Sequence, residues 1–168
     1  PWFHRRRGKV VMFIGNEYDL MDEKIRFIQQ AGVEYVCSQL PEQAARWLYA
    51  ECRSSKILTM PHALNPGLYH PGEAGRRPVE LGFRGARYPK FIGDSERNDL
   101  LDFFERNAAS LGVAIDFSYQ NIRRGEWADF LRGCRAVVGA EAGTYYLDRR
   151  GRAITAARRY MKENPQAD

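Results

Sequence analysis

The chain has 168 residues, of which 44% are hydrophobic and 28% are charged, and its formal net charge is +5. This length predicts a domain of ordinary size that can bury a core without disulfides or metal, and the composition excludes intrinsic disorder. The small positive excess is spread evenly along the chain, which argues against a nucleic-acid binder with its charge gathered on one face.

The first 60 residues alternate between strand and helix patterns. Asp19 is a suitable helix cap, and Gly32 a suitable helix end. Pro41 suits the first turn of a second helix, where a missing N–H costs nothing. Strands that alternate with helices favour a parallel sheet. The predicted strands are 9–15, 33–38 and 56–60, and the predicted helices are 19–32 and 41–52.

A proline-rich stretch, ILTMPHALNPGLYHPGEAG, follows at 57–75, with Pro61, Pro66 and Pro71 five residues apart. Proline fixes φ and cannot join a central strand, and it pushes the residue before it into extended geometry. Such a segment suits a stiff connector that leaves one sheet and enters another. The alternative is a long surface loop within a single sheet.

The strand and helix rhythm then resumes. The predicted strands are 79–85, 113–118 and 136–140, and the predicted helices are 94–112, 127–134 and 154–161. We therefore predict an α/β protein with two Rossmann-like lobes, 1–60 and 76–168, joined by the connector 61–75. Three strands are few for a sheet, so we expect both lobes to be incomplete.

The charged, cysteine and apolar patterns indicate where the protein is located and what it contacts. The dense basic run 5–7 is explained by a solvated face as well as by a nucleic-acid contact. Cys37, Cys52 and Cys134 are odd in number and far apart, as in a cytosolic protein with reduced thiols. The apolar run 10–14 is too short for a membrane span or a signal peptide. We expect a cytoplasmic protein with no membrane span.

In open α/β sheets, ligands bind beyond the carboxyl ends of the strands, and the first candidates lie there. Glu17 follows the first strand, where a carboxylate can act as a general base toward an acceptor hydroxyl or can brace a loop. His62 and Asn65 lie at the predicted lobe junction. They can contact a ligand between the lobes, or serve as hinge residues bonded to the backbone.

A second group follows the strand at 79–85. Gly85 lets the backbone approach a ligand closely, and Arg84 and Arg87 bring positive charge that fits a diphosphate. The sequence lacks GxGxxG, GxxxxGK[ST] and GxSxG, and its histidines and cysteines lack the spacing of a metal site. We therefore expect no metal and no cofactor.

The third group follows the strand at 136–140. The Glu141 carboxylate can accept two hydrogen bonds from a ribose diol. The small turn at Gly143 and Thr144 lets a phosphate reach backbone N–H groups. A tight turn with no ligand explains these residues equally well.

Taken in order, five stretches resemble bacterial glycosyltransferases of the spore-maturation or spore-coat type, which have the two-lobed GT-B fold. The stretches are GNEYDLMDEK, CSQLPEQAARWLY, MPHALNPGLYHP, ELGFRGARYPKFIGDSERNDLL and FLRGCRAVVGAEAGTYYLD. The resemblance runs from about residue 9 to residue 165 and depends on the ordered series, because no single motif is strongly specific.

This resemblance implies that the first lobe binds an acceptor and that the second binds a nucleoside-diphosphate sugar, without a metal. It matches the donor lobe's glycine loop to residues 83–87. The first part of the acidic nucleotide motif matches Glu141, Gly143 and Thr144. The rest of that motif would lie after Asp168, and the first strands would precede Pro1, so we expect an internal segment that is inactive alone.

The expected reaction of the complete enzyme is transfer of a sugar from the nucleotide to a hydroxyl of an unknown acceptor. One alternative is a non-catalytic α/β module that binds nucleotide or carbohydrate without turnover. Another is a basic α/β domain that binds nucleic acid through Arg5 to Arg7, with an affinity that salt abolishes.

Overall fold

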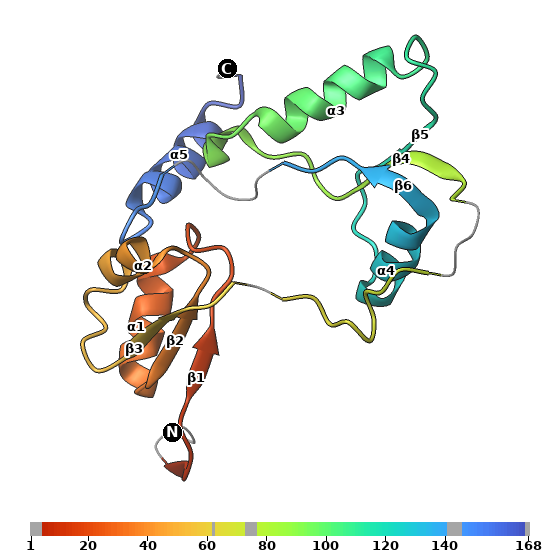
Figure 1. The fold of residues 1–168 in the computed structure, drawn as a ribbon. Coiled ribbons are helices and arrows are strands. Elements are labelled where there is room, and N and C mark those ends of the chain that lie inside the picture. The colour runs from red at the N-terminus through yellow and green to blue at the C-terminus, as the bar shows by residue number, and fades with distance from the viewer. Residues whose placement is uncertain (1–4, 62, 73–76, 141–145, 167–168) are drawn as a thin grey trace. The chain divides into compact units, whose positions relative to one another are not determined.

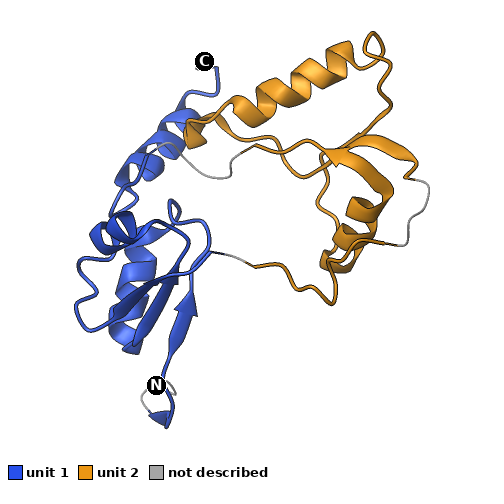
Figure 2. Cartoon of the chain, viewed as in Figure 1, with its two compact units in different colours: residues 1–62, 143–168 blue, residues 63–142 orange. Residues whose placement is uncertain are grey.

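The structure is a computed structural model that describes residues 5–61, 63–72, 77–140 and 146–166. The chain forms two compact units: unit 1 comprises 1–62 and 143–168, and unit 2 comprises 63–142 (Figure 2). Each unit contains its own three-stranded parallel sheet (Figure 1). The segments before and after the prolines therefore belong to separate sheets, as the sequence predicts.

Unit 1 begins with a β-α-β-α-β run and ends with a helix from the far end of the chain. Its strands lie in the order β1-β2-β3 and are all parallel. Both crossovers step in the same direction, so the right-handed rule puts α1 and α2 on one face. The elements are β1 (Val11–Phe13), α1 (Met21–Ala31), β2 (Tyr35–Ser38), α2 (Glu42–Leu48), β3 (Lys56–Thr59) and α5 (Arg152–Glu163).

The core of unit 1 lies on one face of this sheet, here called sheet A. Met12, Val36 and Ile57 are cross-strand neighbours, and they pack with the buried stripe of α1. That stripe consists of Met21, Ile25, Ile28 and Ala31, at the spacing of one helical face. The neighbouring positions of β1 face the other way, and Phe13 is 66% exposed.

Unit 2 contains the second sheet, sheet B, whose strands lie in the order β5-β4-β6, again all parallel. Gly82 of β4 lies directly under α4, where an added Cβ would come within 2.7 Å of Phe130. The elements are β4 (Val79–Arg84), the 3-10 turn η2 (Lys90–Ile92), α3 (Glu96–Asn107), β5 (Ile115–Ser118), α4 (Arg124–Gly133) and β6 (Cys134–Val137).

Three details differ from the sequence prediction. The segment 143–168, expected in the second lobe, belongs to unit 1. Cys134, expected on a helix, begins β6. The helix α2 ends at Leu48 rather than near Cys52, and its Trp47 is 45% exposed. The guanidinium of Arg149 stacks on the Trp47 ring, 4.7 Å from its centroid.

Ion pairs hold the returning segment onto unit 1. Arg150 pairs with both Asp22 at the start of α1 and Glu51 after α2. On α5, Arg158 pairs with Asp19 at 2.6 Å. These partners lie more than 90 residues away from the arginines in sequence. Helix periodicity alone therefore could not assign α5 to this unit.

In the part of the chain that the structure describes, no helix combines the length and the apolar character that crossing a membrane requires.

Candidate functional site

In sheet B, where all strands are parallel, the order of the connections reverses at β4. The connection after β4 leads to β5 on one side, and the next connection leads across to β6 on the other side. In open parallel sheets a ligand crevice forms at the carboxyl ends of strands where the order reverses in this way. The carboxyl ends of β4 and β6 are therefore the candidate site in unit 2.

Two glycines lie at this edge. Gly85 follows β4 with a φ of 139°, a conformation that L side chains rarely adopt. Its N–H continues the ladder to β5 by donating to the Ser118 carbonyl at 3.2 Å. On the other side, the Val138 N–H donates to the Gly82 carbonyl at 3.0 Å, and Gly139 follows next in the chain. A glycine thus lies shortly after each of these two paired strands, so no side chain at either position covers the backbone.

Arg84 lies beside Gly85 but turns back into the unit. Its guanidinium donates to the Asp116 carboxylate at 2.7 Å and to the Asp116 carbonyl at 2.9 Å. It also covers the Phe130 ring, 4.3 Å from the centroid. With 16% of its side chain exposed, Arg84 fastens β4 to β5 and α4 in this structure.

Arg87 lies in the loop after β4 and bonds to two carboxylates. One guanidinium nitrogen lies 2.6 Å from Asp102 and the other lies 2.9 Å from Glu105, both on α3. The hydrogen bond to Asp102 raises the pKa of the Arg87 guanidinium. Its side chain is 36% exposed, so a phosphate that displaced one carboxylate would find Arg87 more accessible than Arg84.

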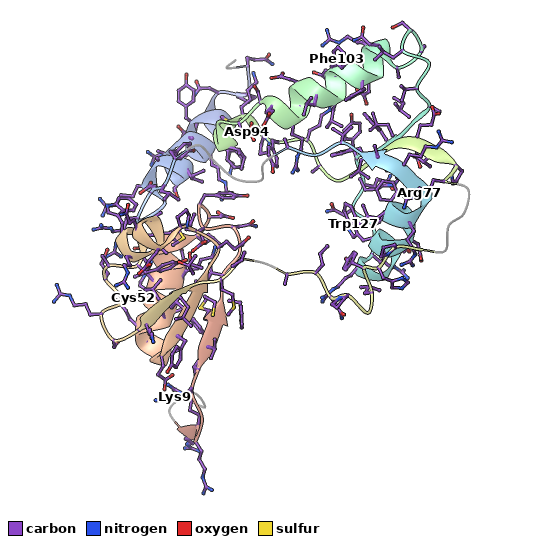
Figure 3. All side chains as sticks on the ribbon, viewed as in Figure 1. Lys9, Cys52, Arg77, Asp94, Phe103 and Trp127 are labelled. Atoms are coloured by element: carbon purple, nitrogen blue, oxygen red, sulfur yellow. The ribbon has the colours of Figure 1, made fainter. Side chains whose placement is uncertain are left out.

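The start of α3 fixes the rest of this loop. Asn98 bonds both backbone groups of Tyr88, accepting from its N–H at 2.9 Å and donating to its carbonyl at 2.8 Å. Arg97 stacks on the Tyr88 ring at 3.8 Å. Asp94, labelled in Figure 3, is buried and accepts the Glu96 N–H at 2.9 Å. Asn98 was not predicted from the sequence, because its partner Tyr88 lies ten residues earlier in the chain.

In unit 1, Glu17 lies just beyond β1 and is only 7% exposed. Its Oε1 accepts hydrogen bonds from the hydroxyls of Ser38 at 2.6 Å and Tyr49 at 2.7 Å. Its Oε2 accepts the Gln39 N–H at 3.1 Å. The carboxylate thus joins the ends of β1, β2 and α2. This geometry favours the loop-bracing role, and the general-base role stays a prediction.

The neighbours of Glu17 reinforce the same edge. Burial, followed by the hydrogen bond to Glu17, raises the pKa of the Tyr49 phenol. Lys24 donates to the carbonyls of Gly15 at 3.2 Å and Asn16 at 2.8 Å, and burial lowers the pKa of its ammonium group. Sequence reasoning missed Ser38 and Tyr49, because nothing in the local pattern links three residues that are 32 positions apart at most.

The other predicted site residues divide into two groups. Asn65 is exposed, and its side-chain oxygen accepts the Gly67 N–H at 2.9 Å, so it forms a local turn within the connector. His62, Glu141, Gly143 and Thr144 lie outside the described residues. Among the residues that are described, no three His, Cys, Asp or Glu side chains gather as a metal site would require.

Compared with protein-family models, curated proteins and solved structures, the chain matches none of them.

Proposed function

We propose that the chain is part of a glycosyltransferase of the two-lobed GT-B type, which transfers a sugar from a nucleoside diphosphate to an acceptor hydroxyl. The observation that carries the proposal is the pair of separate parallel sheets on either side of the prolines. The second of these sheets also reverses its strand order at β4, as nucleotide-binding sheets do. The resemblance in sequence supports the same assignment.

In this proposal the donor nucleotide binds at the carboxyl ends of β4 and β6. The diphosphate contacts the Gly85 backbone, while Arg84 stiffens the loop and Arg87 exchanges a carboxylate for a phosphate oxygen. The roles of Glu141 with the ribose and of Gly143 and Thr144 with phosphate are proposed from the resemblance in sequence alone, because these residues lie outside the described part of the chain. These contacts stabilise the charge that develops on the leaving diphosphate.

The acceptor belongs to unit 1 in this proposal. His62 and Asn65 lie at the passage between the units in the sequence. Glu17 is the proposed base, and it would need to lose at least one of its three hydrogen bonds to reach a hydroxyl.

The burial of Glu17 favours a second candidate function, namely binding of a nucleotide or carbohydrate without turnover. A general base must come within hydrogen-bond distance of the proton it removes, and a carboxylate that is 7% exposed meets that requirement poorly. The two candidates differ in one result. A transferase releases nucleoside diphosphate from its donor when an acceptor is added, whereas a binding module does not. The assay is made on the full-length protein.

A panel of nucleoside diphosphates and nucleotide sugars, tested by thermal shift, examines the donor site. We expect at least one of them to raise the melting temperature of the wild-type chain. Gly85→Ala should reduce that shift, because a side chain would block the approach of the backbone to phosphate. Gly112→Ala is the matched control, since Gly112 also has a positive φ (65°) but an added Cβ there meets nothing within 4 Å. Equal ligand shifts in the two variants would contradict the proposed site.

A further inference from the structure

A cavity of about 420 Å³ in unit 1 lies outside the proposed donor and acceptor sites. It is formed where the turn that begins α5 meets the first turn of α1. Four arginines line it, namely Arg150, Arg152, Arg158 and Arg159.

Two of the four arginines have structural partners within the unit. Arg150 pairs with Asp22 and Glu51, and Arg158 pairs with Asp19. These pairs fasten α5 to α1 and so hold the walls of the cavity in place. They also neutralise three carboxylates, of which Asp19 and Asp22 line the cavity.

The side chains of the other two, Arg152 and Arg159, make no hydrogen bond or ion pair with any described residue, and both residues are exposed. They lie on the same face of α5 as Thr155 and Ala156, at positions i, i+3, i+4 and i+7, and all four residues line the cavity. Seven residues span about 10 Å along a helix axis, so two long arginine side chains can converge on one ligand between them.

We propose that this cavity binds a pyrophosphate group through the guanidinium groups of Arg152 and Arg159. Each planar guanidinium matches two oxygens of one phosphate, and a ligand with two phosphate groups uses both arginines. The first turn of α1 forms the facing wall without a side-chain cap among the described residues, and its N–H groups add a smaller attraction for anions.

One carboxylate opposes the ligand. Glu23 lines the cavity and is exposed, and its negative charge repels phosphate. This opposition gives the proposal a variant that should strengthen binding. Replacing the Glu23 carboxylate with a neutral amide removes the repulsion and leaves both arginines in place.

The test is a titration of the whole 168-residue chain with inorganic pyrophosphate, measured by calorimetry and by ¹⁵N amide NMR. We expect saturable binding that shifts the amides of Asp22, Arg152 and Thr155. Arg152→Gln with Arg159→Gln should weaken binding by about tenfold or more, the loss expected when charged hydrogen bonds are removed. Glu23→Gln should strengthen it.

Arg53→Gln is the matched control. Arg53 is also an exposed arginine of unit 1, but it does not line the cavity, so its removal should leave the affinity unchanged. Unchanged binding in the double variant, or an affinity for pyrophosphate no greater than that for phosphate, would overturn the proposal. So would pyrophosphate shifts confined to Gly85 and its neighbours, because those amides report the proposed donor site instead.

Discussion

The two sheets share their parallel order but end differently at their carboxyl edges. In sheet A the strand order runs in one direction, and a buried carboxylate, Glu17, closes the edge by accepting three hydrogen bonds. In sheet B the order reverses at β4, and the edge presents Gly85 with a φ of 139°. We call the carboxyl edge of sheet A, bonded through Glu17, the closed edge. We call the carboxyl edge of sheet B, where Gly85 lies, the open edge.

This difference shows that a charged residue at a strand end is weak evidence for a site by itself. Glu17 follows the first strand of sheet A, and Arg84 ends the first strand of sheet B in the chain. Both side chains make hydrogen bonds within their own unit, Glu17 with Ser38 and Arg84 with Asp116. Strand order and glycine geometry locate the candidate crevice better, because they determine where backbone groups remain accessible to a ligand.

The largest expected effect concerns the closed edge. Glu17→Ala leaves the buried hydroxyls of Ser38 and Tyr49 without their acceptor, so we expect the free energy of unfolding to fall by about 3 kcal/mol. Urea unfolding measures it. Glu42→Ala is the control, because Glu42 is an exposed ion-pair partner of Arg46 and should cost less than about 0.5 kcal/mol. A similar small loss at Glu17 would show that its carboxylate is free for other chemistry.

The second largest expected effect concerns the packing of α4 against β4 in sheet B. In Gly82→Ala the new Cβ would lie 2.5 Å from the Cys134 Sγ, and such overpacking costs about 2 kcal/mol. Gly125→Ala in α4 is the matched control, since nothing lies within 4 Å of its added Cβ. It should stabilise the helix by about 0.5 kcal/mol. If both variants unfold alike in urea, sheet B and α4 do not pack as described.

A smaller effect distinguishes the two arginines of the open edge. Arg84→Met loses the bonds to Asp116 and should lower the free energy of unfolding by about 1.5 kcal/mol. Arg87→Met, at a more exposed site, should lower it by about 0.5 kcal/mol but should reduce nucleoside-diphosphate binding more. Chemical denaturation and calorimetry on the same two variants test both statements. The reverse ranking in binding would assign the phosphate contact to Arg84.

The smallest effect is a pH dependence in unit 1. The N–H of Val10 at 2.8 Å and then the Arg6 guanidinium lower the pKa of Glu34 below its usual 4.5. A lowered pKa in the folded state adds stability above the unfolded value and loses it as the pH falls through the folded value. Glu34→Gln should therefore flatten the loss of stability below about pH 4.5. The free energy of unfolding, measured by urea denaturation at several pH values, checks this. If it falls below about pH 4.5 as steeply in the variant as in the wild type, Glu34 does not contribute to the pH dependence.

The sequence predicted the strands, most helices and the division into two sheets, because period-2 and period-3.6 patterns and proline chemistry act locally. It did not assign α5 to unit 1, since that depends on Arg150 and Arg158 finding carboxylates more than 90 residues away. It identified Glu17 and Arg84 but could not reveal their hydrogen-bond partners, which only the tertiary fold brings together.

The central claim is that a nucleotide binds at the carboxyl edge of sheet B and not at that of sheet A. A ¹⁵N amide NMR titration of the chain with uridine diphosphate and adenosine diphosphate tests it most directly. We predict saturable shifts for Gly85, Ala86 and Gly139, with no shift for Glu17 and Gln39. Shifts centred on Glu17, or an unmoved Gly85 at saturating concentrations of both nucleotides, would contradict it.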